Sequence, residues 1–278
     1  MGLSSGTLLQ QTTFNFLKKI IEDRAFKLSY SEEHLYAGEG NERVGYLHIF
    51  PMICFSEIPL SSIHYHLNRY GNCLIGMKKK WIMANGFTPV HYYHQNSKIA
   101  ISLLTNYHYI FEKVKGYDGL YEEHKDEVNL LHALEFQVAY AKNYSGVVNS
   151  KNYKDENYVF AEEKEWRFVP SHENYFTPIS LPPEDFIADK AKYQEKIGEH
   201  KVSFDLSDIS FIVGSSSDEK NELIALLGEM GNNSINVFTN TEIKQDFLGY
   251  QNPSIDDYRM RLEKEKLKSE LDELKNRE

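Results

Sequence analysis

The sequence predicts an α+β protein in which helices surround a mixed β-sheet. Short segments rich in β-branched and aromatic residues recur along the 278-residue chain, as is typical of strands. Near the end of the chain one helical segment stands between two such strands, which predicts a βαβ-like unit. Residues 96–145 show helical periodicity instead, and we expect them to form a helical insertion between strands.

The first 60 residues predict two strands and a helix. Residues 7–11 form the first expected strand, and Thr13 is placed to cap the helix that follows. Residues 31–43 are polar and contain two glycines, so we expect a loop there, before a strand centred on residues 52–55. The apolar positions of the helix are Phe14, Phe16, Leu17, Ile20 and Ile21.

Residues 61–93 predict two further strands with short helical segments, and Gly71 is suited to end the first of these helices. The expected elements are a helix from Ser61 or Ser62 to about Tyr70, a strand over 73–77, a helix or turn over 78–86 and a strand over 89–93.

The insertion contains two helical faces joined by a linker with two glycines and four acidic residues. After it, we expect a strand at 165–169 and the βαβ-like unit at 209–238. The apolar faces are Ile99, Leu103, Leu104, Tyr107, Ile110 and Phe111 in the first helix, and Val128, Leu131, Leu134, Val138 and Ala141 in the second.

Residues 251–278 predict a charged C-terminal helix that protrudes from a single domain over residues 1–250. Ser254 and Asp257 approximate a capping pair, and from residue 254 onward seven basic and eight acidic residues nearly cancel. The helix is either a docking element for a partner or for itself, or a solvated helix that frays. Its thin apolar seam consists of Met260, Leu267, Leu271 and Leu274.

Composition excludes several classes of protein. The formal net charge of −10 argues against a protein that coats DNA through bulk electrostatics. Two cysteines, Cys54 and Cys73, are too few for a four-cysteine zinc site and favour a reducing, cytoplasmic location. No run of 18 apolar residues and no basic-then-apolar leader is present, so we expect neither a membrane span nor a secretory signal.

Three sequence features leave both a functional and a structural interpretation open. The pairs His64/His66 and His91/His94 are metal ligands or ordinary histidines, and we expect no metal because no cluster completes either pair. The run Lys78–Lys80 before Trp81 binds nucleic acid or forms a solvated turn. Residues 214–217 form an anion-binding nest or a plain turn.

The segment Glu162–Arg167 is the strongest candidate for chemistry. Glu163 and Glu165 lie two residues apart at the start of an expected strand, so their side chains would share a face. Two adjacent carboxylates repel, and we expect one to be partly protonated or hydrogen-bonded. Such a pair can hold a ribose hydroxyl and stabilise an oxocarbenium ion. The alternative is an acidic loop before an edge strand.

Three segments together resemble the AbiGi family of abortive phage-infection proteins, over roughly residues 5–95 and 155–245. The first is Phe50–Leu60, FPMICFSEIPL, which is similar to the family's PMVCFCDIPLS-type stretch. The third is Glu163–Arg167, which is similar to its E-x-E-W-R motif. Between them the matching positions are His66, Tyr70-Gly71, Ile75-Gly76-Met77, Lys80-Trp81 and Pro89-Val90-x-Tyr92.

The family is distantly similar to DarT-like ADP-ribosyltransferases, and this resemblance implies a split mixed β-sheet with NAD, as substrate, in the cleft between two small sheets. It implies Glu165 as the catalytic carboxylate and Glu163 as the residue that guides the acceptor. The first-strand position that is usually His is Gln10 here, which can hydrogen-bond but carries no charge. The expected NAD contacts are Gln10, Thr12, Phe55, Ser56, His66, Tyr70 and Arg167.

The resemblance implies an NAD-dependent ADP-ribosyltransferase toxin of an anti-phage defence system, restrained by an antitoxin protein. The acceptor would be a base in single-stranded RNA or DNA, held in a groove formed by Lys78, Lys79, Lys80 and Trp81. The alternative is a component without catalysis: an antitoxin, for which the missing His marks lost activity, or a module that binds a nucleotide without turnover.

Overall fold

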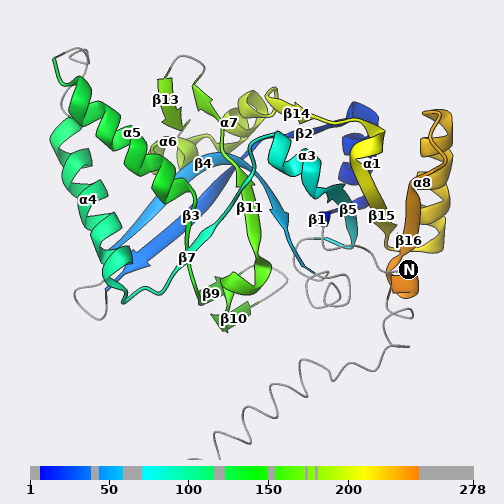
Figure 1. Ribbon diagram of the computed structural model, residues 1–278, viewed down its shortest axis with the longest axis horizontal. Coiled ribbons are helices and arrows are strands. Elements are labelled where there is room, and N and C mark those ends of the chain that lie inside the picture. The colour runs from blue at the N-terminus through cyan, green and yellow to red at the C-terminus, as the bar shows by residue number, and fades with distance from the viewer. Residues whose placement is uncertain are drawn as a thin grey trace, which may run out of the picture. The chain divides into compact units, whose positions relative to one another are not determined.

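The computed structural model describes residues 7–38, 44–58, 71–115, 123–149, 154–172, 175–178 and 181–243. The chain divides into two compact units, residues 1–240 and residues 241–278. The fold below is that of the first unit (Figure 1). The expected C-terminal helix lies outside the described residues, as does the expected helix over 61–70.

A mixed sheet of eight strands forms the centre of the described chain, in the order β16-β15-β5-β1-β4-β11-β6, and β3 pairs with β4 beside this path. All pairs are antiparallel except β15 and β16, which are parallel around the expected helix and confirm the βαβ unit. The strands are β1 Thr7–Thr12, β3 Ser29–Ala37, β4 Val44–Ser56, β5 Cys73–Lys78, β6 Thr88–Pro89, β11 Glu165–Phe168, β15 Ile209–Gly214 and β16 Asn236–Thr239.

Helices and four two-stranded pairs surround this sheet. The helices are α1 Phe14–Asp23, α3 Lys79–Ala84, α4 Lys98–Val114, α5 Lys125–Ala139, α6 Pro183–Ala188, α7 Lys190–Ile197 and α8 Ser217–Glu229, with the 3-10 turns η3 Phe160–Glu163 and η4 Leu206–Asp208. The pairs are β2 Ala25–Lys27 with β14 Lys201–Ser203, β7 His91–Tyr93 with β8 Ala141–Asn143, β9 Gly146–Asn149 with β10 Lys154–Tyr158, and β12 Ser171–His172 with β13 Tyr175–Pro178.

Strand β4 separates two hydrophobic cores. Because alternate residues of a strand point to opposite faces, Ile49, Ile53 and Phe55 enter one core while Phe50 and Met52 enter the other. The first core lies against α1, α3 and α8, and contains the aromatic cluster Phe26, Phe55, Trp81, Phe87 and Phe204.

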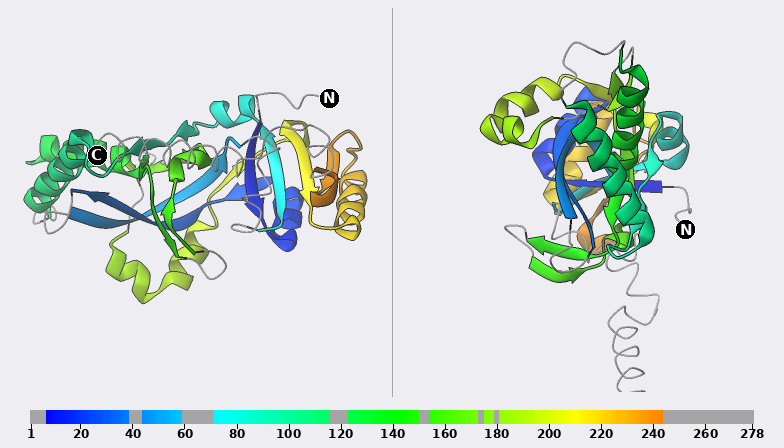
Figure 2. Two further views of the ribbon diagram at one scale, coloured as in Figure 1. Left: turned by 90° about the horizontal axis from the view of Figure 1, so that it is seen from below. Right: turned by 90° about the vertical axis from the view of Figure 1, so that its left-hand side faces the viewer.

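The second core lies between the β3–β4 ribbon and the two long helices (Figure 2). Ser97 caps α4 by accepting a hydrogen bond from the N–H of Ala100. Most of the expected apolar positions enter this core, but Ile99 and Phe111 of α4 are exposed, and Ala141 lies on β8 rather than in α5. Strands β7 and β8 pair in parallel just before α4 and just after α5. The two helices expected for the insertion are therefore confirmed.

The prediction of a loop over residues 31–43 was wrong, because residues up to Ala37 belong to strand β3. Polar side chains occupy most of β3, whose buried positions are only Tyr30, Leu35 and Ala37. This pattern is too sparse for a clear alternation. Two side-chain amides bind the free edge of β3: Gln194 exchanges two hydrogen bonds with the backbone of Tyr30, and Asn143 two with Tyr36.

Strands β1 and β4 pair at a single position, Leu9 with Ser56, whereas β1 pairs along its whole length with β5. Beyond that position the amide of Gln10 donates to the carbonyl of Cys54 at 3.4 Å. The mixed sheet is thus joined only weakly between β1 and β4, next to the end of β11.

Candidate functional site

Strand β11 places the two charged residues of the E-x-E-W-R motif on one face. Glu165 pairs with Ser56 and Arg167 pairs with Cys54 across to β4, so their side chains share the face of β4 that also bears the second core. Trp166 points to the opposite face, against the first core. The strand begins abruptly because Lys164 adopts a left-handed conformation, with φ of 44°, that ends η3.

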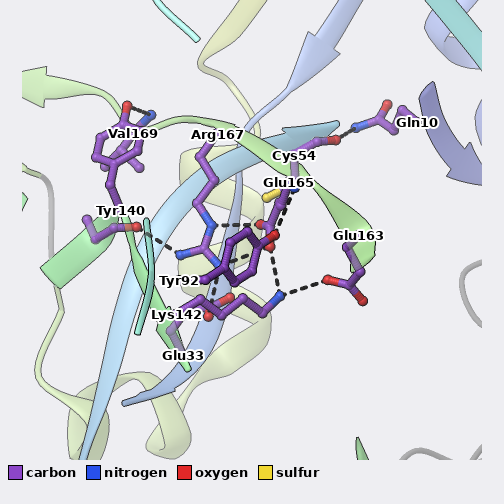
Figure 3. Close-up of polar contacts among 11 residues, drawn as sticks. Gln10, Glu33, Cys54, Tyr92, Tyr140, Lys142, Glu163, Glu165, Arg167 and Val169 are labelled. Carbon is purple, nitrogen blue, oxygen red and sulfur yellow. Dashed lines mark hydrogen bonds and ion pairs between the residues drawn. The ribbon is translucent and has the colours of Figure 1, made fainter. Parts of the chain in front are cut away.

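Arg167 is fully buried and makes four polar contacts (Figure 3). Its Nε and Nη2 lie 2.6 and 3.2 Å from the two oxygens of Glu165, and Nη2 lies 3.0 Å from Oε2 of Glu33 on β3. Its Nη1 donates to the carbonyl of Ala139 at 2.8 Å, at the C-terminal end of α5, where a cation is favoured by the helix dipole.

Lys142 on β8 connects the two glutamates of the motif (Figure 3). Its Nζ lies 2.7 Å from Oε2 of Glu165 and 3.1 Å from Oε2 of Glu163. The other oxygen of Glu163 accepts a hydrogen bond of 2.9 Å from the hydroxyl of Tyr158. The two glutamates therefore do share a site, but Glu163 lies in η3 rather than on the strand, and a shared ammonium offsets their repulsion.

Three carboxylates and two cations make up this buried charge network: Glu33, Glu163, Glu165, Lys142 and Arg167. Burial alone would raise the pKa of Glu165, but Arg167 and Lys142 outweigh it and lower that pKa well below its usual range. Burial opposes the charge of Arg167 and Lys142, yet the carboxylates raise the pKa of both. Both cations and Glu165 are therefore ionised at neutral pH.

Neighbouring groups complete the surroundings of Glu165. The backbone N–H of Glu165 donates to the hydroxyl of Tyr92 at 2.9 Å, and burial is the main cause that raises the pKa of Tyr92 to about 12. Burial and the charge of Glu165 raise the pKa of the Cys54 thiol well above its usual value. Both groups are therefore protonated and uncharged at neutral pH.

The expected NAD contacts are not gathered at one site in the described residues. Gln10 and Ser56 are half-buried and lie around the weak β1–β4 junction, and Thr12 pairs with Cys73 at the far end of β1. Arg167 is enclosed by its four polar contacts. Phe55 is 1% exposed inside the aromatic cluster, so its ring has no face for a nicotinamide. His66 and Tyr70 lie outside the described residues.

The expected nucleic-acid contacts do not form one surface. Trp81 is buried in the aromatic cluster and donates to the carbonyl of Ser203, so its ring is not available to stack on a base. Lys78 donates to the carbonyl of Ser207, while Lys79 pairs with Glu57 at 2.8 Å and lies over the ring of Trp166. Lys80 is exposed.

Residues 214–217, for which an anion nest and a plain turn were both open, are bonded within the chain itself. Glu219, in the first turn of α8, accepts hydrogen bonds from the backbone N–H and the hydroxyl of Ser215, and Ser216 caps the helix. No group of three or more metal-ligating side chains exists within the part of the chain that the structure describes, which includes His91 and His94. His64 lies outside that part.

Sequence reasoning missed three residues of the network: Glu33, Lys142 and Tyr158. Glu33 lay in a stretch interpreted as a loop, and Lys142 lay near the end of the expected insertion, more than 20 residues before its partners. The pairing of Glu165 with Arg167 could have been found, because the alternation that relates residues 163 and 165 also relates 165 and 167.

Comparison with known proteins gives a consistent assignment. Residues 24–215 match the family described as "Putative abortive phage resistance protein AbiGi, antitoxin". The abortive phage resistance protein AbiGi of Lactococcus lactis subsp. cremoris is 30% identical over 195 residues, which cover 64% of this chain and 76% of that protein. No solved structure matches this chain. Among the helices described, none is long and apolar enough to cross a bilayer. The chain belongs to the AbiGi family of abortive phage resistance proteins.

Proposed function

We propose that this chain is the antitoxin component of an abortive phage infection system and acts by binding a toxic partner protein, without catalysis. The observation that carries the proposal is the state of Glu165. Its carboxylate is 6% exposed, and both of its oxygens are held by Arg167 and Lys142. A carboxylate whose two oxygens are both engaged by buried cations supports a structural role, because those contacts would have to be broken before it could bond to a substrate.

Two further observations support a protein without catalysis. The family description names an antitoxin. The first-strand position carries Gln10 rather than His, and the rings of Phe55 and Trp81, expected to hold a nicotinamide and a base, lie within the core. These observations favour recognition of a partner protein by the folded surface. In this role the charge network stabilises the fold that presents the surface.

The test is growth of bacteria that express the chain alone, the toxin of the same defence system alone, or both. The proposal expects normal growth with the chain alone, arrest with the toxin and recovery with both. Glu165→Gln in the chain expressed alone should also be harmless. Arrest by the chain alone, relieved by Glu165→Gln, would show a toxin and overturn the proposal.

ADP-ribosyl transfer from NAD to RNA or DNA is the second candidate, and one observation favours it. Leu9, Ser56 and Glu165 pair in one row across β1, β4 and β11, and the β1–β4 pairing ends at that row. A ligand between β1 and β4 would therefore lie next to Ser56, whose neighbour on the other side of β4 is Glu165. In this candidate NAD is the substrate, and a restraining antitoxin would be a separate protein.

Purified protein distinguishes the two candidates. It is incubated with NAD labelled in the nicotinamide, with and without RNA, DNA or protein, while calorimetry records NAD binding. Nicotinamide release that is lost in Glu165→Gln supports transfer. Binding without release indicates a nucleotide-sensing module, and absence of both removes this candidate while leaving the antitoxin proposal intact.

A further inference from the structure

Lys164 has a backbone conformation that is unusual for a lysine. Its φ of 44° lies in the left-handed region, which disfavours a residue with a Cβ and favours glycine or asparagine. The residue forms the turn between η3 and β11, in the middle of the E-x-E-W-R motif. Strained residues of this kind cluster at functional sites, so the presence of a lysine here calls for an explanation.

The backbone contacts of Lys164 explain the turn. Its N–H donates to the carbonyl of Ala161 at 3.3 Å, and its carbonyl accepts from the N–H of Glu57 at 3.1 Å. A glycine would make both contacts equally well. The side chain of Lys164 is exposed and makes no hydrogen bond, ion pair or ring contact with another described residue. The fold therefore does not account for a long cationic side chain at this position.

Arg24, with a φ of 47°, is the other residue with a Cβ that adopts a positive φ in the described chain. It follows the ten-residue helix α1, whose C-terminal end favours a cation. Lys164 follows only the four-residue turn η3, which has few aligned peptide dipoles. The helix dipole thus explains the charge of Arg24 but contributes little at Lys164.

The surface around η3 also carries exposed apolar side chains. The N–H of Ala161 in η3 donates to the carbonyl of Tyr144 at 3.2 Å, and a Cβ on Gly146 would lie 3.0 Å from the ring of Phe160. The turn between β8 and β9 therefore packs against η3. Two large side chains beside this contact are exposed, Tyr144 by 48% and Val147 by 67%.

We propose that Tyr144, Val147 and Lys164, the η3 surface, dock on the toxic partner protein, with an acidic side chain of that protein paired to Lys164. This inference rests on the antitoxin function proposed above. Aromatic and apolar side chains are typical of the core of a protein interface, and a neighbouring cation selects a carboxylate. A nucleic acid is disfavoured, because the exposed Glu162 lies two residues from Lys164 and the chain has a formal net charge of −10.

The experiment measures two properties of the full chain: its affinity for the purified toxin protein of the same defence system, by calorimetry, and its folding equilibrium, by urea unfolding. Lys164→Gly and Lys164→Asn remove the cation and suit the left-handed conformation. Their folding equilibrium constant should equal that of the wild type or exceed it by up to about fivefold. Their affinity for the toxin should nevertheless fall by about five- to tenfold.

The controls separate the charge of Lys164 from its backbone conformation. Lys164→Arg keeps the cation and should bind within about threefold of the wild type. Arg24→Gly removes an exposed cation from the same left-handed conformation and should leave the affinity unchanged. Val147→Ser should weaken binding, whereas Phe16→Ser, at a position on α1 that is 65% exposed, should not.

Failure of this inference is distinguishable from failure of the antitoxin proposal. If the wild type does not bind the toxin, the antitoxin proposal fails and this inference fails with it. If the wild type binds and Lys164→Gly binds equally well, only this inference is overturned.

Three other outcomes also overturn the inference. In the first, Lys164→Arg binds as weakly as Lys164→Gly, or Val147→Ser binds as tightly as the wild type. In the second, neither Lys164→Gly nor Lys164→Asn folds, which would give the lysine a structural role. In the third, Lys164→Gly weakens the binding of a labelled single-stranded RNA but not of the toxin, which would assign the η3 surface to a nucleic acid.

Discussion

Arg167 and Glu165 are paired through two hydrogen bonds, of 2.6 and 3.2 Å, between side chains two residues apart on one face of β11. The guanidinium is fully buried, so its charge depends on the carboxylates of Glu165 and Glu33 that lie against it. Such a pair adds little to the free energy of unfolding compared with an apolar replacement of both residues. Removal of one partner alone lowers that free energy strongly, because the other charge stays buried.

Arg167→Met should therefore destabilise the protein by about 3–5 kcal/mol, because Glu165 and Glu33 would keep buried charge without the guanidinium. Urea unfolding at pH 7 measures this change. The matched control is Lys190→Met, which removes an exposed pair and should cost below about 1 kcal/mol. Similar losses in the two variants would contradict the role given to Arg167.

His48 should make the protein sensitive to mild acid. Its ring is 7% exposed, packs on Phe50 and Tyr107, and leaves Nε2 without a hydrogen-bond partner. Burial, and then His34, lower the pKa of His48 to about 4. Since the unfolded chain binds this proton near pH 6.5, stability is full above that pH and is lost as pH falls from 6.5 towards 4.

The loss from His48 should reach about 3 kcal/mol at pH 4. His48→Phe should remove this part of the pH dependence, as measured by urea unfolding between pH 4 and pH 7.5. His108→Gln, at an exposed position on α4, is the control and should keep the dependence. An unchanged acid profile in His48→Phe would show that other groups cause it.

Asn143 should protect the free edge of β3. Its amide accepts from the N–H of Tyr36 at 2.9 Å and donates to the carbonyl of Tyr36 at 2.8 Å, as a neighbouring strand would. Asn143→Ala should cost about 1–3 kcal/mol and speed amide exchange at Tyr36. Exchange at Tyr30, held by Gln194, should change less, and equal acceleration at both would indicate general loosening.

Gly71 should tolerate no side chain. Its φ is 129°, and a Cβ there would lie 2.2 Å from the carbonyl oxygen of Thr12. Gly86 has a φ of 78° with no atom within 4 Å of the same position. Gly71→Ala should therefore lower the melting temperature more than Gly86→Ala, which meets only the backbone penalty of roughly 1 kcal/mol. Equal shifts would contradict the close approach.

The sequence predicted the elements whose pattern is local. The helical faces of α4 and α5, the strand at Glu165 and the parallel pair around α8 followed from periodicity over a few residues. Strand β3 did not, because charged and polar side chains occupy most of it and it buries only Tyr30 in the first core and Leu35 and Ala37 in the second. Its pairing with β4 depends on contacts that a single segment does not reveal.

In the candidate site, too, only the residues that are close together in the sequence could be predicted. Glu163, Glu165 and Arg167 stand close together in the motif and could be named from it. Their environment could not, because Lys142 and Glu33 come from other elements, β8 and β3, and only the folded sheet brings them to β11. Those distant partners determine whether the carboxylate of Glu165 is paired with cations. The motif alone therefore does not indicate whether this carboxylate has a catalytic or a structural role.

The placement of β4 between the two cores has a thermodynamic consequence. Ile49 and Ile53 contribute to one core and Phe50 and Met52 to the other from the same 13-residue strand. If one core opened while β4 stayed packed against the other, one apolar face of the strand would be exposed to water. The opening of either core is therefore coupled to the opening of the other. The helical insertion and the remainder of this unit should accordingly melt together, as one cooperative unit with a single transition.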